Sequence, residues 1–320
     1  MLSFGTSKNR FNHLSYTSIK AEGAPFSLDC TFLLTMTNNR HGLILEGGAM
    51  RGLFTAGVID VMMEAGIEFD CLVGVSAGSS FGCNYKSRQP GRVLRYNLRF
   101  CKDSRYMGLS TLLRTGDLVG GEFAYHTMPL ELDVFDSATF ESNPMDFYSV
   151  CTDVATGAPV YYKMDKVTYE SLEWLRASAS MPGVTRPVKV DDGRYMLDGG
   201  ISDSIPLEFA HKIGLKRNVV ILTQPRDYVK QPAPRTLLKL FLKRYPAIMH
   251  AMEHRHEMYN AQLEYLRRHV ESGDTLVIAP SAPLPIGRVS SNRARMRHVY
   301  QLGRQAALDN IEKVKQFLSI

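Results

Sequence analysis

The chain has 320 residues, of which 44% are hydrophobic and 22% charged, and its formal net charge is +6 at pH 7. These fractions are typical of globular proteins and exclude a largely disordered chain. No stretch approaches the roughly 18 to 20 consecutive apolar residues of a membrane-spanning helix, so we expect no integral membrane protein.

The N-terminal region is rich in Ser, Thr and Asn and lacks hydrophobic periodicity. We predict a flexible tail over residues 1–39, or an extension upstream of a true start at Met36, and a single domain over residues 40–320. The apolar run CTFLLTM is too short and too poorly flanked for a secretory signal. The cysteines contain no CxxC pair, which argues against a disulfide framework or a zinc site. They are Cys30, Cys71, Cys83, Cys101 and Cys151. We therefore predict a protein of the reducing cytoplasm.

Short apolar runs alternate with helical patterns after the tail. Strands are predicted at 42–45 and 71–75, and helices over 53–64 and from Ala77 onward. This alternation is typical of parallel strands with helices on both faces of the sheet. We therefore predict an α/β fold, a three-layer α/β/α sandwich with a mostly parallel central sheet.

The remaining elements extend this plan. Residues 90–145 read mostly as helices and loops that could cap the sheet, and 146–164 predict an antiparallel hairpin at a sheet edge. Further strands are predicted at 187–190, 195–198, 218–223 and 275–279, and helices over 169–179, 235–271 and from 293 to the C-terminus.

The run GVSAG at residues 74–78 follows a predicted strand and precedes a predicted helix. A G-x-S-x-G run in this context is typical of a nucleophile elbow, a sharp turn that exposes a strained serine. Gly74 and Gly78 remove the Cβ clashes that such a turn would otherwise create. Ser76 is therefore a candidate nucleophile, although the same pattern also suits a tight turn with an idle serine.

A second glycine cluster, EGGAMRG, lies between the first predicted strand and helix. Free N–H groups of Gly47, Gly48 and Ala49 could converge there on an oxyanion, with the positive charge of Arg51 nearby. The rival interpretation is a degenerate dinucleotide fingerprint, G-x-A-x-x-G. That fingerprint requires an acidic residue after the second strand, where this sequence has the serine elbow.

A serine hydroxyl needs an adjacent base. None of the six histidines between residues 211 and 298 lies in a short strand-end loop flanked by small residues, and His250, His254 and His256 fall inside the long helix predicted over 235–271. These histidines are His211, His250, His254, His256, His269 and His298. Asp198, at the end of a predicted strand and before Gly199, is the better candidate, although it also suits an ordinary turn.

Together, GGAMRG, GVSAGS and DGG, in this order, resemble the patatin-like phospholipases over about residues 42–222, and CTDVATG and RASASMPGV add to the resemblance. The resemblance implies a Ser-Asp dyad with Ser76 as nucleophile and Asp198 as base, and an oxyanion hole formed by Gly47, Gly48 and Ala49. It implies supporting roles for Arg51, Gly74, Gly78 and Gly199. Neither a cofactor nor a metal is expected.

The sequence departs from the family pattern at two positions. Ala49 stands where the family usually has a third glycine, and Ser204 stands where asparagine is common. A Cβ at Ala49 could narrow the oxyanion loop or tilt one of its N–H groups. We expect both departures to tune rate or substrate choice without abolishing activity.

The resemblance implies phospholipids or other lipid esters as substrates. Residues 235–252 mix leucines with basic residues, which suits either transient association with an anionic membrane surface or a helix packed on the sheet. Arg288, Arg293, Arg295 and Arg297 lack interleaved aromatic residues, so we expect no nucleic-acid partner. A soluble carboxylesterase or thioesterase, and a catalytically silent lipid-binding protein, remain open as alternatives.

Overall fold

The computed structural model describes residues 39–319, apart from the side chains of residues 109 and 110. The tail predicted over residues 1–39, with Cys30 and Met36, therefore lies outside the described residues except for Asn39. Within the described part of the chain, no helix is both long and apolar enough to cross a membrane.

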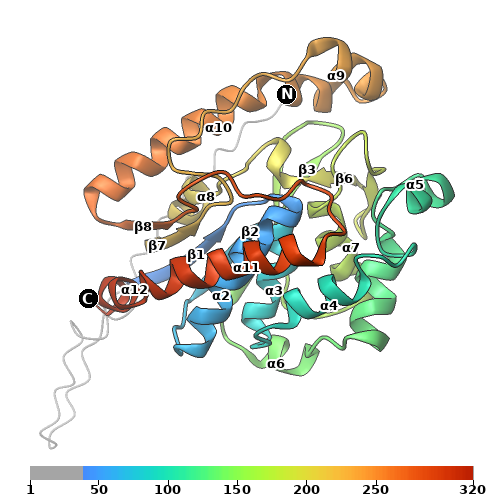
Figure 1. Ribbon diagram of the computed structural model, residues 1–320. Coiled ribbons are helices and arrows are strands. Elements are labelled where there is room, and N and C mark those ends of the chain that lie inside the picture. The colour runs from blue at the N-terminus through green and yellow to red at the C-terminus, as the bar shows by residue number, and fades with distance from the viewer. Residues whose placement is uncertain (1–38, 320) are drawn as a thin grey trace, which may run out of the picture. The chain divides into compact units, whose positions relative to one another are not determined.

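The described residues form an eight-stranded sheet (Figure 1). Its order is β5-β6-β3-β2-β1-β7-β8, and β4 pairs with β3. Strands β3, β2, β1, β7 and β8 are mutually parallel, which confirms the mostly parallel sheet predicted from the sequence. The strands are β1 (Arg40–Leu45), β2 (Cys71–Val75), β3 (Asp146–Asp153), β4 (Pro159–Lys163), β5 (Val188–Lys189), β6 (Tyr195–Asp198), β7 (Leu215–Ile221) and β8 (Thr275–Ile278).

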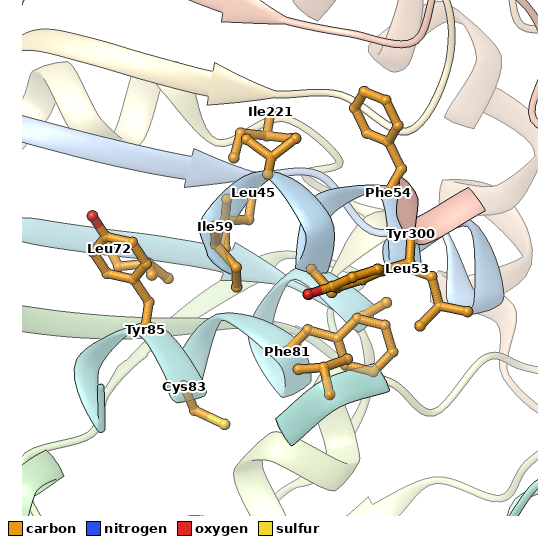
Figure 2. Packing of buried hydrophobic residues seen from close by; sticks show 14 of the residues in the cluster. Leu45, Leu53, Phe54, Ile59, Leu72, Phe81, Cys83, Tyr85, Ile221 and Tyr300 are labelled. Atoms are coloured by element: carbon orange, nitrogen blue, oxygen red, sulfur yellow. The ribbon is translucent and has the colours of Figure 1, made fainter. Parts of the chain in front are cut away.

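Helices cover both faces of the sheet, as predicted. Because successive side chains of a strand point to opposite faces, Leu43 and Leu45 pack in one apolar cluster and Ile44 in another. The first cluster contains α2 (Gly52–Glu64), α3 (Ala77–Lys86) and α11 (Arg293–Leu308), whose side chains meet those of β1, β2 and β7 in Figure 2. The second contains α8 (Leu207–Lys212) and α10 (Pro246–Ser272).

Two predicted helices are interrupted. The helix predicted over 235–271 is α9 (Arg235–Leu242) followed by α10, because a proline at the first position of α10 disfavours helical backbone at the preceding Tyr245. The C-terminal helix is α11 followed by α12 (Ile311–Leu318).

The hairpin predicted over 146–164 is present, but its placement at a sheet edge is only half right. β3 and β4 pair antiparallel, and β4 lies at an edge. β3 is an interior strand, because β2 and β6 both pair with its other side. β3 is nearly completely buried. This burial explains why the adjacent apolar residues Val150 and Cys151 interrupt the alternation of apolar and polar residues.

Residues 90–145, which we call the cap, form mostly helices and loops, as predicted. The helices are α4 (Arg92–Phe100), α5 (Leu109–Thr115), the π-helix η2 (Phe123–Leu132) and α6 (Ser137–Ser142), and α7 (Tyr169–Ser178) follows later in the chain. α4 packs against α2, α3 and α11, and α6 packs against α3.

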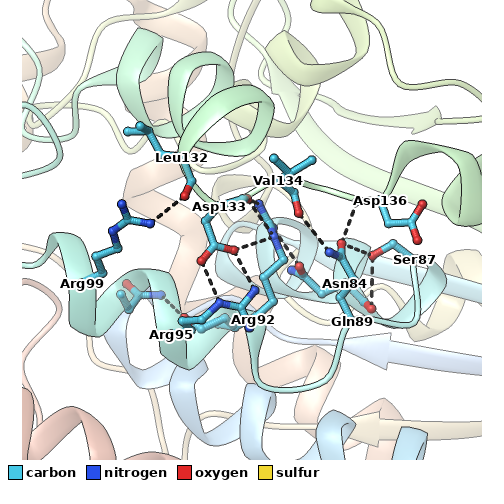
Figure 3. Close-up of polar contacts among 12 residues, drawn as sticks. Asn84, Ser87, Gln89, Arg92, Arg95, Arg99, Leu132, Asp133, Val134 and Asp136 are labelled. Carbon is cyan, nitrogen blue, oxygen red and sulfur yellow. Dashed lines mark hydrogen bonds and ion pairs between the residues drawn. The ribbon is translucent and has the colours of Figure 1, made fainter.

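Within the cap, an ion cluster joins the end of η2 to α4 (Figure 3). Arg95 donates from Nε and Nη2 to the two carboxylate oxygens of Asp133 at 2.8 and 2.9 Å, and Nε of Arg92 lies 3.2 Å from one of them. Arg92 also donates to Asn84 of α3 at 2.9 Å. The side chains of Arg92 and Asp133 are buried and paired, whereas that of Arg95 is largely exposed. The cluster fixes the end of η2 relative to α3 and α4.

Candidate active site

Ser76 lies in a sharp turn between β2 and α3, where the sequence predicted a nucleophile elbow. Its backbone has φ 55° and ψ −120°, a conformation that residues with a Cβ rarely adopt. Two hydrogen bonds through the side chain of Ser178 stabilise this conformation. The N–H of Ser76 donates to Oγ of Ser178 at 2.9 Å, and that hydroxyl donates to the carbonyl of Val150 at 2.6 Å. Ser178 therefore joins the strained turn to β3.

The glycines of the elbow are required by close contacts. A Cβ on Gly78 would lie 2.3 Å from the carbonyl oxygen of Leu45, and one on Gly74 would lie 2.6 Å from Cα of Ser79. Likewise, a Cβ on Gly199 would lie 2.2 Å from the carbonyl oxygen of Val150. Larger residues at these positions would push apart the elements that position Ser76 and Asp198.

The topology of β3 brings the ends of β2 and β6 together. β2 pairs with β3 as far as Val75 and Val150, and β6 continues along the same side with Asp198 opposite Cys151. The two strands run in opposite directions, so the turn after Val75 and the last residue of β6 meet there. Ser76 and Asp198, more than a hundred positions apart in the sequence, thereby become neighbours.

Asp198 is buried, and its surroundings set its basicity. Burial raises the pKa of the Asp198 carboxyl above its ordinary value, whereas hydrogen bonds from Ser76 and Gly200 and the charges of Arg255 and Arg288 lower it. The N–H of Gly200 donates to Oδ1 at 2.8 Å. The resulting raised pKa makes this carboxylate a stronger base than an aspartate in water.

The loop after β1 supplies backbone donors beside Ser76. A Cβ on Gly47 would lie 2.8 Å from Cβ of Ser76, which shows how closely the loop approaches the serine. Within residues 39–319, the N–H groups of Gly47, Gly48 and Ala49 donate to no other protein group. The same holds for the N–H of Ala77, at the start of α3. The four N–H groups are therefore free to bind an anion.

Arg51 lies in the short 3-10 helix η1 (Ala49–Arg51), which follows this loop. Its N–H donates to the carbonyl of Gly48 at 3.1 Å, so its main chain closes the turn. Its side chain lines a cavity, and its Nε is buried without a hydrogen-bond partner.

Ser76 and Asp198 open into this cavity, which has a volume of about 560 Å³ and is lined mainly by apolar atoms. A volume of this size suits a small organic ligand. Apolar side chains of residues 90–145 and of the helices α3 and α7 form one part of this lining, which we call the apolar arm. They include Phe81, Tyr96, Tyr106, Ala124, Tyr125, Met128, Pro129, Phe135, Leu172 and Leu175.

Three cationic residues that the sequence analysis did not assign to the site also line the cavity: Lys230, Arg255 and Arg288. From the sequence, Arg288 was considered only as part of a basic run. Arg255 belongs to α10. Arg255 lies one helical turn before the buried Tyr259, and therefore on the same side of the helix. A charged residue on the buried side of α10 was the sequence signal that could have identified it.

No histidine of the described residues lines the cavity. His211, His269 and Asp274 form the one group of three potential metal ligands found in residues 39–319, and it too lies outside the cavity lining. Ser204, the second departure from the family pattern, does line the cavity, and its hydroxyl donates to the carbonyl of Gly200 at 2.8 Å.

Comparison with known proteins gave two family matches. The model described as "Patatin-like phospholipase" matches residues 43–211, and one described as a domain of unknown function matches residues 245–319. The "Uncharacterized protein YjjU" of Escherichia coli is 30% identical over 276 residues, which are 83% of this chain and 75% of that protein.

More distant relatives have functional names. "Lysophospholipase nte1" of Aspergillus oryzae is 29% identical over 56% of this chain, and human "Patatin-like phospholipase domain-containing protein 6" is 26% identical over 60%. The matched regions span only 11% and 14% of those two proteins. The crystal structure of VipD from Legionella pneumophila aligns with a TM-score of 0.40 at 14% identity, over 85% of this chain and 67% of that one.

The backbone of Ala49 yields a prediction about stability. Ala49 has φ 49°, in the left-handed region where a Cβ costs about 1–2 kcal/mol. The substitution Ala49→Gly removes that strain, and the greater freedom of glycine in the unfolded chain offsets part of the gain. We expect Ala49→Gly to raise the free energy of unfolding in urea by about 0.5–1 kcal/mol.

The matched control is Ala306→Gly, in the regular helix α11, which should lower the same quantity by about 1 kcal/mol. If Ala49→Gly destabilised the protein as much as this control does, the backbone strain assigned to Ala49 would be wrong.

Proposed function

This chain belongs to the patatin-like phospholipase family, and on that premise we propose that it is a lipid acyl hydrolase of the phospholipase A or lysophospholipase type. The proposed catalytic unit is the domain over residues 40–320. The observation that carries the proposal is the position of Ser76, in a strained turn beside a buried aspartate and free backbone donors, at the wall of an apolar cavity.

The proposed reaction proceeds through an acyl-enzyme. Oγ of Ser76 attacks the ester carbonyl while Asp198 accepts the hydroxyl proton, and Asp198 then gives that proton to the alcohol oxygen as the ester C–O bond breaks. Water next attacks the acyl-enzyme and loses a proton to Asp198, and the proton passes to Oγ of Ser76 as the fatty acid is released. The raised pKa of Asp198 supports its role as base.

The oxyanion of each tetrahedral intermediate would bind the N–H groups of Gly47, Gly48 and Ala49. Each such donor typically contributes about 3–4 kcal/mol to transition-state stabilisation. The positive φ of Ala49 supports this assignment. A glycine would adopt this backbone conformation without strain, and the chain keeps the conformation although the residue is alanine.

The two alternatives left open by the sequence are distinguished from a lipid hydrolase in different ways. A soluble esterase for short esters needs little apolar volume, whereas the apolar arm suits a long acyl chain. A silent lipid-binding protein would have the same cavity, so only chemistry at Ser76 distinguishes it from an enzyme.

A fluorophosphonate probe tests the dyad. We expect the wild-type protein to be labelled, Ser76→Ala to be unlabelled, and Asp198→Asn to be labelled about 100-fold more slowly or worse, since a positioned base contributes about that much. The readout is the labelling rate, measured on variants whose folding has been checked by circular dichroism.

Ser80→Ala is the matched control, because Ser80 also lines the cavity but lies inside α3. Its labelling should continue. Folded wild-type protein that stays unlabelled, with and without anionic liposomes, would favour the silent lipid-binding alternative.

Helix α9 supports delivery of the substrate from a membrane surface. Leu237, Leu240 and Phe241 are 50%, 69% and 52% exposed, and Leu237 and Phe241 also line the cavity. Exposed Lys239 and Lys243 lie on the same short helix or at its end. Apolar residues mixed with cations at a cavity opening suit insertion into an anionic lipid surface.

We therefore expect Leu240→Ser to weaken binding to phosphatidylglycerol vesicles by about tenfold in a sedimentation assay, because a buried leucine contributes about 1.5 kcal/mol or more. The control is Leu308→Ser, at a residue of α11 that is 53% exposed and remote from the cavity lining. Equal vesicle binding by the two variants would contradict a docking role for α9.

A further inference from the structure

Five cationic side chains line the cavity that contains Ser76, and one of them, Arg92, is paired with Asp133. The other four are Arg51, Lys230, Arg255 and Arg288. Among the described residues, none of the four makes an ion pair with a carboxylate within 4.0 Å, whereas many surface arginines and lysines of this chain do. Partly buried cations without counter-ions are costly, so the arrangement calls for an anionic ligand.

The four cations are close enough to affect one another. Burial, together with the charges of Arg255, Arg288 and Arg51, lowers the pKa of Lys230 to about 7. The Nζ of Lys230 lies 4.5 Å from the ring centroid of Tyr259. Burial and the charge of Arg288 likewise lower the pKa of Arg255. The four residues therefore form one cluster, which we call the cationic cluster.

The acidic groups of the cavity do not neutralise the cationic cluster. Glu46 accepts hydrogen bonds from the N–H of Thr223 at 2.6 Å, from its hydroxyl at 3.2 Å and from Tyr259 at 2.7 Å. Asp198 is the proposed base and accepts from Gly200. With both carboxylates ionised, the three arginines of the cluster still outnumber them by one, before any positive charge on Lys230 is counted.

The geometry of the cavity places the cationic cluster beside the proposed reaction centre. Nε of Arg255 donates to the carbonyl of Gly200, next to Asp198, and Arg51 follows the oxyanion loop. In a glycerophospholipid, the phosphate is only a few bonds from the acyl ester, so an acyl chain in the apolar arm leaves the phosphate near the cluster.

We propose that Lys230, Arg255 and Arg288 bind the phosphate of the substrate and select glycerophospholipids whose head group has a net negative charge. Guanidinium groups suit phosphate oxygens, and Glu46, already bonded to Thr223 and Tyr259, offers little to the ammonium of a choline or ethanolamine head group. This inference rests on the proposed hydrolysis at Ser76.

The proposal also gives a role to the C-terminal region. Arg255 and Arg288 both lie in residues 245–319, the range matched by the domain of unknown function. In this chain, that region contributes helices to both faces of the sheet, the strand β8 and, on our proposal, two residues of the head-group site. The residues that select the lipid would then lie in a different part of the sequence from the residues that catalyse its hydrolysis.

Binding to the non-hydrolysing Ser76→Ala protein tests the proposal without requiring turnover. Dihexanoyl phosphatidylglycerol and dihexanoyl phosphatidylcholine, which have the same acyl chains, are titrated calorimetrically below their micellar concentrations. We expect the anionic lipid to bind at least about tenfold more tightly, and Arg288→Gln to remove most of that preference, since a charge-assisted hydrogen bond accounts for a factor of this size.

Arg297→Gln is the matched control, because Arg297 is exposed on α11 and lies outside the cavity lining. It should leave the preference intact. Equal binding of the two lipids, or equal loss in Arg288→Gln and Arg297→Gln, would overturn the proposal. Inorganic phosphate should bind much more weakly than the anionic lipid, and equal affinity would contradict a site for lipid head groups.

Hydrolysis by the wild-type protein distinguishes a failure of this inference from a failure of the proposed function. Hydrolysis of both lipids at equal kcat/KM would overturn the head-group selection while supporting the esterase. Tight anionic-lipid binding without hydrolysis of either lipid or of p-nitrophenyl butyrate would support the head-group site and contradict the proposed reaction.

Discussion

The pairing pattern of β3 is the constraint on which the candidate site depends. One side of β3 is shared by two strands that approach from opposite ends, so the turn after β2 meets the end of β6. Neither Ser76 nor Asp198 would be near the other without this shared side. Ser178 reinforces the junction, because its hydroxyl connects the N–H of Ser76 to the carbonyl of Val150 in β3. The strained backbone of Ser76 is thus held by β3, a strand that is buried over its last five residues.

A buried carboxylate at that junction determines much of what surrounds it. Hydrogen bonds and nearby positive charges offset part of the desolvation of Asp198, the proposed base. Arg255 supplies one of those charges from α10, far along the chain, and also bonds to the carbonyl of Gly200. The C-terminal helices therefore do more than cover the sheet, since their charges act directly on the proposed reaction centre.

Much of the fold could be predicted because the relevant signals are local. Alternating apolar runs and helical patterns predicted the parallel sheet, and the ordered glycine motifs predicted which turns would converge. The break before Pro246 and the interior position of β3 were missed, because a proline inside an apolar pattern can either kink or end a helix, and pairing partners are not encoded locally. Arg255 was missed for a related reason: which face of a long charged helix is buried depends on packing. The role of Ala49 as a residue with positive φ was visible only in the backbone.

The central claim is that Ser76, Asp198 and the loop of Gly47, Gly48 and Ala49 act on one reacting carbon. A crystal structure of the protein after reaction with diisopropyl fluorophosphate tests it most directly, because the phosphorus mimics the tetrahedral intermediate. The account predicts phosphorus bonded to Oγ of Ser76, with the phosphoryl oxygen about 3 Å from at least two N–H groups of that loop or of Ala77. Phosphorus on another residue, or a phosphoryl oxygen directed away from these donors, would contradict it.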